Sequence, residues 1–81
     1  MPYSKIIVQK KGGGFVKGAR VSLEFPMLYH PLSAGFTKSF YTDGNGEVKI
    51  EHSNTGRANI YVDGKEVGKF NAPDEELVFI S

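Results

Sequence analysis

Apolar and polar residues alternate along most of this chain, and this alternation is the feature that most limits its fold. The clearest stretch is residues 19–25, where four apolar residues are separated by Arg20, Ser22 and Glu24. Successive side chains of a β-strand point to opposite faces, so this period of two predicts a strand with one buried face. Amphipathic helices are not expected, because glycine or proline interrupts most segments that could form one.

The same alternation recurs in short segments along the rest of the chain. We expect strands at residues 6–8, 19–25, 38–42, 48–51, 58–62, around 67 and 77–80. About seven short strands at close spacing predict an all-β fold, either an antiparallel β-sandwich or a small barrel. The residues expected in its core are Val21, Leu23, Phe40, Ile50, Ile60 and Val62.

The strongest turn signal is the dipeptide Asp63-Gly64, which lies between two apolar segments. This pair suits the two positive φ angles of a type I′ turn, which matches the twist of the flanking strands. With these two residues as the loop, Val62 is expected to face Lys65. One step further from the turn, Ile60 is expected to face Val67.

Length and composition limit the class of protein. The 81 residues form one small domain, residues 1–81, without room for a second. Ten basic and nine acidic residues give a net charge of +1, which excludes a strongly basic nucleic-acid binder. The absence of cysteine excludes disulfides, thiolate nucleophiles and cysteine-ligated zinc.

The amino-terminal segment bears on localisation. Its apolar run is too short for a signal peptide or a membrane span. We therefore expect a cytoplasmic protein, or an extracellular one if the domain is cut from a longer secreted chain.

Asp43, Asn45 and Glu47 place oxygen-bearing side chains at alternate positions, as a calcium loop does. An EF-hand loop also needs glycine at its sixth position and glutamate at its twelfth, and these positions hold Val48 and Asn54. The segment is therefore interpreted as a hairpin turn that does not bind calcium. We expect the Asp43 side chain to accept hydrogen bonds from the turn amides, with positive φ angles at the two glycines of the turn, Gly44 and Gly46.

Other motifs for catalysis or cofactor binding are incomplete. Three glycines at residues 12–14 follow two lysines, but a phosphate loop requires a helix after the glycines, and a strand is expected here. His30 and His52 are expected on the surface, because nothing in their spacing brings them together around a metal. No serine has an evident base, and no carboxylate pair is placed for acid–base chemistry. We predict that the protein is not an enzyme and holds no metal and no cofactor.

The chain has four tyrosines and six phenylalanines, many for its length. Three phenylalanines fall within expected strands and are expected to be buried, namely Phe25, Phe40 and Phe79. Three tyrosines fall outside the strands or at outward positions, namely Tyr29, Tyr41 and Tyr61. Exposed tyrosines can anchor a partner, although packing against their own sheet is the favoured role here.

Three segments, VKGARVSL, YTDGNGEVKI and GRANIYVDGK, resemble the carboxypeptidase regulatory-like domain. In that family a Gly-Ala-x-Val strand precedes a Thr-Asp-x-x-Gly turn and a returning strand with tyrosine. The matching residues are Gly18, Ala19, Val21, Thr42, Asp43, Gly46 and Tyr61. Phe15 departs from the pattern, since the family usually has proline there. The resemblance implies a small transthyretin-like β-sandwich, similar in architecture to immunoglobulin-like domains, that acts as an accessory module without a catalytic centre.

Residues 26–36, which begin at Pro26 and end at Phe36, lack alternation and are expected to form a long surface loop. We interpret Leu28 and Leu32 as a lid over one end of the sandwich. Tyr29 and His30 are the candidate contact residues for a protein or carbohydrate partner, because a hydroxyl and an imidazole can stay partly hydrated while offering directional bonds.

Two functions remain open from the sequence. The first is a noncatalytic binding or structural module with an unknown ligand. The second is a small OB-like β-barrel that binds single-stranded nucleic acid, with basic and aromatic residues within residues 10–20. The near-neutral charge makes nucleic acid the less favoured partner, and no membrane contact is expected.

Overall fold

The computed structural model describes residues 2–25, 37–53 and 55–80. Seven strands and no helix lie within these ranges. The strands are β1 (Tyr3–Lys10), β2 (Arg20–Glu24), β3 (Phe40–Tyr41), β4 (Glu47–Glu51), β5 (Gly56–Val62), β6 (Lys65–Ala72) and β7 (Glu75–Ile80).

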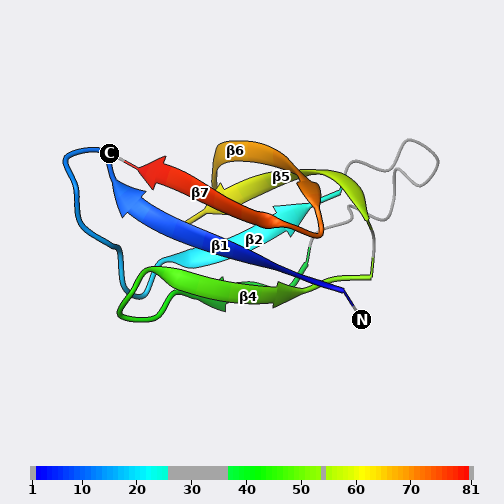
Figure 1. Cartoon of the computed structure of the whole chain (residues 1–81), viewed down its shortest axis with the longest axis horizontal. Coiled ribbons are helices and arrows are strands. Elements are labelled where there is room, and N and C mark those ends of the chain that lie inside the picture. The colour runs from blue at the N-terminus through cyan, green and yellow to red at the C-terminus, as the bar shows by residue number, and fades with distance from the viewer. Residues whose placement is uncertain (1, 26–36, 54, 81) are drawn as a thin grey trace.

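The strands form two sheets that pack face to face, as Figure 1 shows. One sheet has the order β4-β1-β7, with β1 antiparallel to β4 and parallel to β7. The other has the order β3-β2-β5-β6, and all of its neighbouring strands are antiparallel. The predicted all-β sandwich of about seven strands is therefore confirmed, although β1 and β7 pair parallel where antiparallel pairing is expected.

The core lies between the two sheets and is built from the inward residue of each alternating pair. Five of the six predicted core residues are buried, namely Val21, Leu23, Ile50, Ile60 and Val62. The sixth, Phe40, is only partly buried and packs against the others, because β3 lies at the edge of its sheet. Ala19 and Phe25 flank β2 and are buried as the alternation predicts.

The hairpin of β5 and β6 differs from its predicted register. Asp63 and Gly64 have φ angles of 53° and 84°, and Val62 faces Lys65, as expected. Beyond this point the register shifts, so Ile60 faces Gly68 rather than Val67. The cause is a β-bulge on β6, which inserts one extra residue and turns the following side chains to the other face.

The prediction that Phe79 is buried is wrong, since its side chain is 48% exposed. The four residues 77–80 are all apolar, so alternation could not indicate which of them point inward. Pairing with β1 turns Val78 into the core and Phe79 outward.

The segment that resembles a calcium loop is a turn, as predicted. The Asp43 carboxylate accepts hydrogen bonds from the backbone N–H groups of Asn45 at 2.8 Å and Glu47 at 3.1 Å. Gly46 has a φ of 71°, but Gly44 does not have the positive φ predicted for it. The Gly46 carbonyl accepts a hydrogen bond from the Val8 N–H at 2.8 Å, so this turn is joined to β1.

Gly46 is the glycine of this turn that the fold requires. A Cβ added at Gly46 would lie 2.5 Å from the Val8 carbonyl oxygen, whereas a Cβ at Gly44 would have no neighbour within 4 Å. We expect Gly46→Ala to lower the free energy of unfolding by at least about 2 kcal/mol, because strain at positive φ adds to the steric conflict. Gly44→Ala is the matched control and should change it by less than about 1 kcal/mol. Urea denaturation measures both, and equal losses for the two variants would contradict this account of the turn.

Candidate functional site

The predicted contact residues Tyr29 and His30, with Leu28 and Leu32, lie outside the described residues. Their assignment as a partner contact and a lid stays a prediction. Within the described residues, the candidate sites lie on the two sheets.

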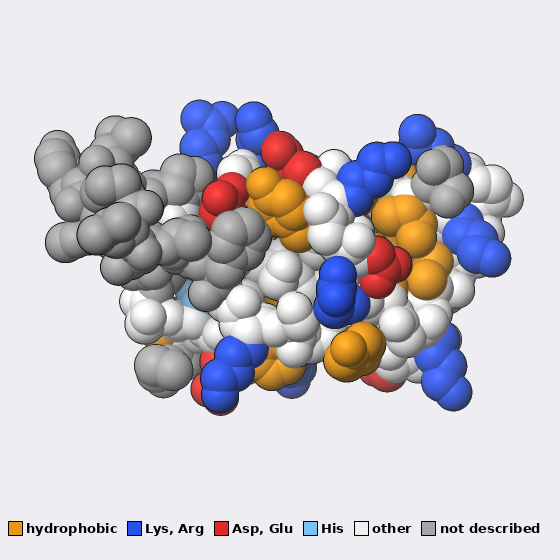
Figure 2. Space-filling view, turned by 180° about the vertical axis from the view of Figure 1, so that it is seen from behind, with side chains coloured by type: hydrophobic (Ala, Val, Ile, Leu, Met, Phe, Trp, Pro, Cys, Tyr) orange, Lys and Arg blue, Asp and Glu red, His pale blue; other side chains and the backbone are white. Residues whose placement is uncertain are grey.

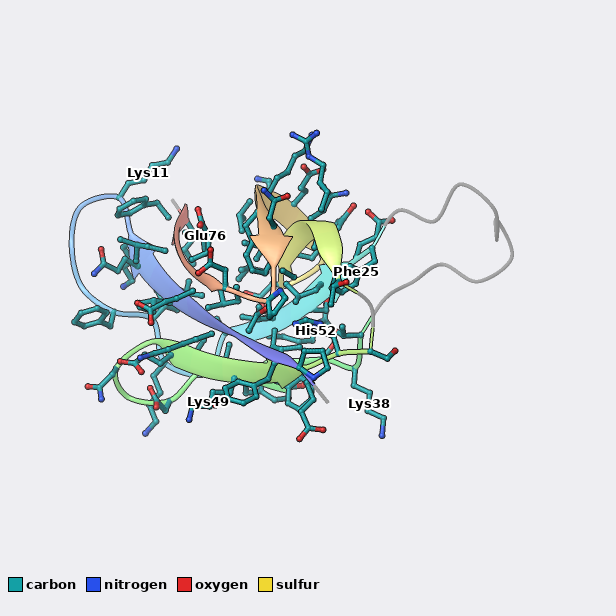
Figure 3. All side chains as sticks on the ribbon, turned by 45° about the vertical axis from the view of Figure 1, so that its right-hand side comes forward. Lys11, Phe25, Lys38, Lys49, His52 and Glu76 are labelled. Carbon is teal, nitrogen blue, oxygen red and sulfur yellow. The ribbon has the colours of Figure 1, made fainter. Side chains whose placement is uncertain are left out.

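His52 is buried, so the prediction that it lies on the surface is wrong. Its Nε2 atom lies 2.8 Å from Oγ of Ser4, and the ring packs against Phe25 with 5.2 Å between ring centroids. The Asp74 N–H donates a hydrogen bond to the same Ser4 oxygen at 3.3 Å. Figure 3 shows Phe25 and His52 at the same end of the sandwich.

This serine–histidine pair has the spacing of a nucleophile and its base. However, Ser4 is only 1% exposed and His52 only 4%, so a substrate cannot reach the hydroxyl. The contacts instead join β1, the residue after β4 and the turn before β7. The pair therefore acts as a buried polar link between three segments. Sequence reasoning missed it because the two residues are separated by 48 positions.

A polar cluster lies on the outer face of β2 and β5. The Glu24 carboxylate accepts hydrogen bonds from the Asn59 amide at 2.8 Å and from the Tyr61 hydroxyl at 3.3 Å. Partial burial, with a further contribution from the negative charge of Glu24, raises the pKa of Tyr61 above its usual value. The cluster joins neighbouring strands, and its carboxylate is already engaged by two donors.

We expect Glu24→Gln to lower the pKa of Tyr61, because the substitution removes the negative charge beside the phenol. Because folding raises the pKa of Tyr61, the neutral phenol stabilises the folded state. This stabilisation is present below the unfolded-state pKa of about 10 and is lost as the pH rises through the folded-state pKa. NMR titration of the tyrosine ring carbons measures the shift. Glu51→Gln on β4 is the control, and an identical Tyr61 titration in wild type and Glu24→Gln would contradict the assignment.

Charges of both signs are interspersed over the back of the molecule, as Figure 2 shows. On the sheet formed by β4, β1 and β7, Lys5 Nζ lies 2.9 Å from Glu47 Oε1 and 3.9 Å from Glu75 Oε1. The hydrogen bond and charge of Glu47 raise the pKa of Lys5. Single-stranded nucleic acid requires a groove of one sign along its backbone, and neither of these surfaces provides one.

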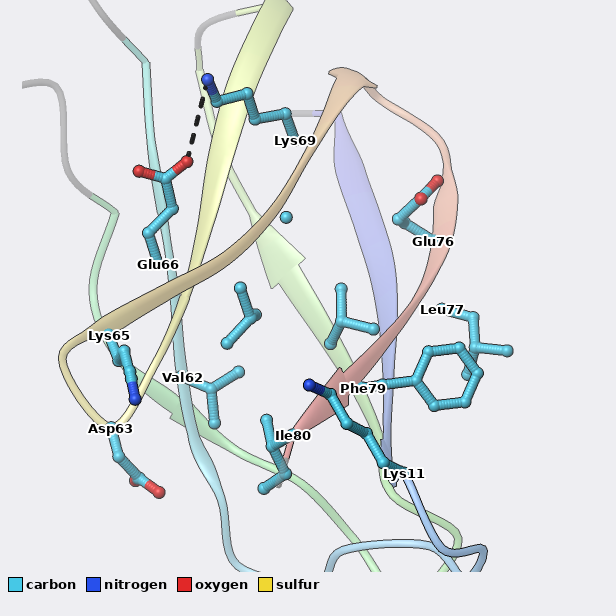
Figure 4. A pocket seen from close by; sticks show the side chains of 13 residues that line it. Lys11, Val62, Asp63, Lys65, Glu66, Lys69, Glu76, Leu77, Phe79 and Ile80 are labelled. Carbon is cyan, nitrogen blue, oxygen red and sulfur yellow. Dashed lines mark ion pairs between the residues drawn. The ribbon is translucent and has the colours of Figure 1, made fainter.

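A groove of about 740 Å³ lies between β6 and β7, where the two sheets separate. Figure 4 shows this groove, with β6 on one side and β7 on the other. Its apolar lining includes Val62, Val67, Val78 and Ile80, and its charged residues are Lys11, Asp63, Lys65, Glu66, Lys69 and Glu76. Both bordering strands are at the edges of their sheets. The groove can therefore accept a chain segment that lies alongside an edge strand.

The outward side of β7 exposes two large apolar side chains, Leu77 at 42% and Phe79 at 48%. In Figure 4 both side chains lie on the opposite side of β7 from Ile80. The carbonyl of Asp74 accepts a hydrogen bond from Lys5 on β1, and that of Ile80 accepts one from Lys11, just after β1. Because backbone groups of alternate residues point to the same side of a strand, the N–H and C=O groups of Leu77 and Phe79 point away from β1. No other described strand pairs with that side of β7.

The remaining edge strands carry features that hinder strand addition. β3 has only two residues, and β6 contains a bulge. On β4 the outward residues are all charged, namely Glu47, Lys49 and Glu51. Short strands, bulges and edge charges are the usual means of blocking an edge. Among the described strands, β7 alone combines a pairing-competent edge with neighbouring exposed apolar side chains.

No group of three or more His, Cys, Asp and Glu side chains within the described ranges could hold a metal ion. Nor does the described part of the chain contain a helix long and apolar enough to cross a membrane. Comparisons with protein-family models, with curated proteins and with solved structures found no match. The resemblance to the carboxypeptidase regulatory-like domain therefore stays a prediction.

Proposed function

We propose that this domain is a noncatalytic binding module, in keeping with its resemblance to carboxypeptidase regulatory-like sandwiches, and that it binds an extended polypeptide along β7. The observation that carries the proposal is the unpaired edge of β7, with Leu77 and Phe79 exposed beside it. An extended segment added to a sheet edge gains main-chain hydrogen bonds, and its alternate side chains contact the two faces of the sheet.

The two faces of β7 determine which side chains a bound segment should carry. Side chains on its inner face would enter the groove beside Val78 and Ile80, whereas those on its outer face would pack against Leu77 and Phe79. Both environments are apolar, and the groove is bordered by charges of both signs. A segment with β-branched or aromatic residues and few charges fits this edge best.

Nucleic-acid binding by an OB-like barrel receives less support. The strands form two separate sheets rather than a closed barrel, and the net charge is only +1. The exposed aromatic residues of the described ranges lie on different strands and loops, so they offer no continuous platform for stacked bases; they are Tyr3, Phe15, Tyr41 and Phe79.

NMR titration tests the proposed binding edge with three defined probes. The first is a short peptide of alternating valine and threonine with lysine at each end, and the second is the same peptide with alternate amides N-methylated. The third is oligothymidine. We expect the first peptide to shift the amide signals of Leu77 and Phe79 saturably, because these groups are placed to bond an added strand.

The N-methylated peptide is the control, because it keeps the side chains but loses the backbone donors on one edge. Equal shifts from both peptides would contradict strand addition. Saturable and salt-dependent shifts with oligothymidine alone would favour the nucleic-acid function instead.

A further inference from the structure

We propose that the segment bound by β7 is β7 of a second copy of this chain, paired antiparallel about a two-fold axis at Val78. This inference rests on the proposed function, since it names the partner for the same edge. The two three-stranded sheets would join into one sheet with the order β4-β1-β7-β7-β1-β4. A two-fold interface uses the same surface on both copies, so this surface must be complementary to itself.

The backbone of β7 meets this requirement. With the axis at Val78, Leu77 of one copy lies opposite Phe79 of the second copy, and the reverse holds by symmetry. The N–H and C=O groups of these two residues are the ones that point away from β1. Both opposed pairs can therefore exchange hydrogen bonds without rearrangement of the β1–β7 ladder.

The exposed side chains also match. Leu77 and Phe79 project from the outer face, so the pairing brings Leu77 of each copy beside Phe79 of the other. Directly opposed aromatic and aliphatic side chains stabilise a strand pair. The two most exposed apolar side chains of β7 would thus cover each other. An axis at Leu77 would place Phe79 beside Glu75, and an axis at Phe79 would place Leu77 opposite residue 81, beyond the end of β7, so either shift loses the contact between Leu77 and Phe79.

The charges near the two ends of β7 are also complementary. Lys11 and Glu76 both line the groove, but Lys11 adjoins the end of β7, where its N–H bonds the Ile80 carbonyl, and Glu76 lies near the start. Figure 4 shows the two side chains at opposite ends of the strand. Antiparallel pairing places Glu76 of each copy opposite Ile80 of the other. Lys11 of that other copy lies on the far side of its Ile80, two strand spacings or roughly 10 Å from this Glu76, a distance that the two long side chains can span in the groove, twice per dimer.

Sedimentation velocity over a concentration range of about 10 µM to about 1 mM, suited to a small interface, tests the proposal. We expect wild type to shift from monomer to a discrete dimer. Lys11→Glu and Glu76→Lys should each weaken the dimer by about tenfold, because each change turns two attractive pairs into two repulsive ones. The double variant Lys11→Glu/Glu76→Lys should recover most of the wild-type association.

Lys49→Glu is the matched control, because it makes the same charge change on β4, at the opposite edge of the same sheet. A second pair of variants tests the apolar contact: Phe79→Lys should abolish dimerisation, whereas Tyr41→Lys, at a residue 66% exposed on the other sheet, should leave it intact. Circular dichroism of each variant shows whether the sandwich is retained.

The outcomes separate this inference from the proposed function. A monomer at every concentration would overturn the pairing of two copies, and peptide-induced shifts at Leu77 and Phe79 in that monomer would leave the binding edge standing. A dimer that tolerates Phe79→Lys, or a double variant no stronger than the single ones, would also overturn it. Open-ended aggregation without a discrete dimer counts against the two-fold axis.

Discussion

The backbone groups at the edges of the two sheets are the constraint on which this structure most depends. Each hydrogen-bonding group must find a partner or stay in water, and a sandwich that does not close into a barrel leaves unpaired edges. The edge strands here are β4 and β7 in one sheet and β3 and β6 in the other. Three of them are shortened, bulged or charged, whereas β7 retains a regular ladder face beside apolar side chains. The proposed function follows from this difference between edges.

β7 can present a regular edge because β1 holds it firmly. β1 lies in the middle of its sheet, and the turn before β4 is joined to it through Gly46 and Val8. Thr42, just before this turn, contacts the segment between β1 and β2, because its hydroxyl accepts a hydrogen bond from the Ala19 N–H at 2.9 Å and donates one to the Val16 carbonyl. At the other end of the sandwich, the buried Ser4–His52 pair joins β1 to the turn before β7. β1, and with it the edge of β7, is thus held at both ends by polar contacts in addition to the core.

The sequence predicts much of this fold because its information is periodic. Alternation places Val21, Leu23 and Ile60 in the core, and Asp63-Gly64 fixes the hairpin turn. Periodicity fails where the pattern itself is lost, as in the wholly apolar run that contains Phe79, and where a bulge resets it, as at β6. A bulge depends on pairing across the sheet, so the sequence of one strand does not determine it.

The candidate site could not be predicted in the same way. Whether a strand lies at an edge is a property of the topology, and nothing local to residues 75–80 shows that β7 has β1 on one side and no described strand on the other. The Ser4–His52 contact is likewise created by long-range packing. The sequence predicts the partner contact at Tyr29 and His30, where alternation stops, whereas residues 77–80 are expected only as a strand with Phe79 buried.

Hydrogen–deuterium exchange of individual amides, measured by NMR in dilute and in concentrated protein, tests the central claim most directly. In dilute protein the Leu77 and Phe79 amides should exchange faster than the Val78 amide, because their N–H groups point away from β1. In concentrated protein both should become protected while amides on β4 stay unchanged. If Leu77 and Phe79 are already as protected as Val78 in dilute protein, the edge of β7 is not available and the account is wrong.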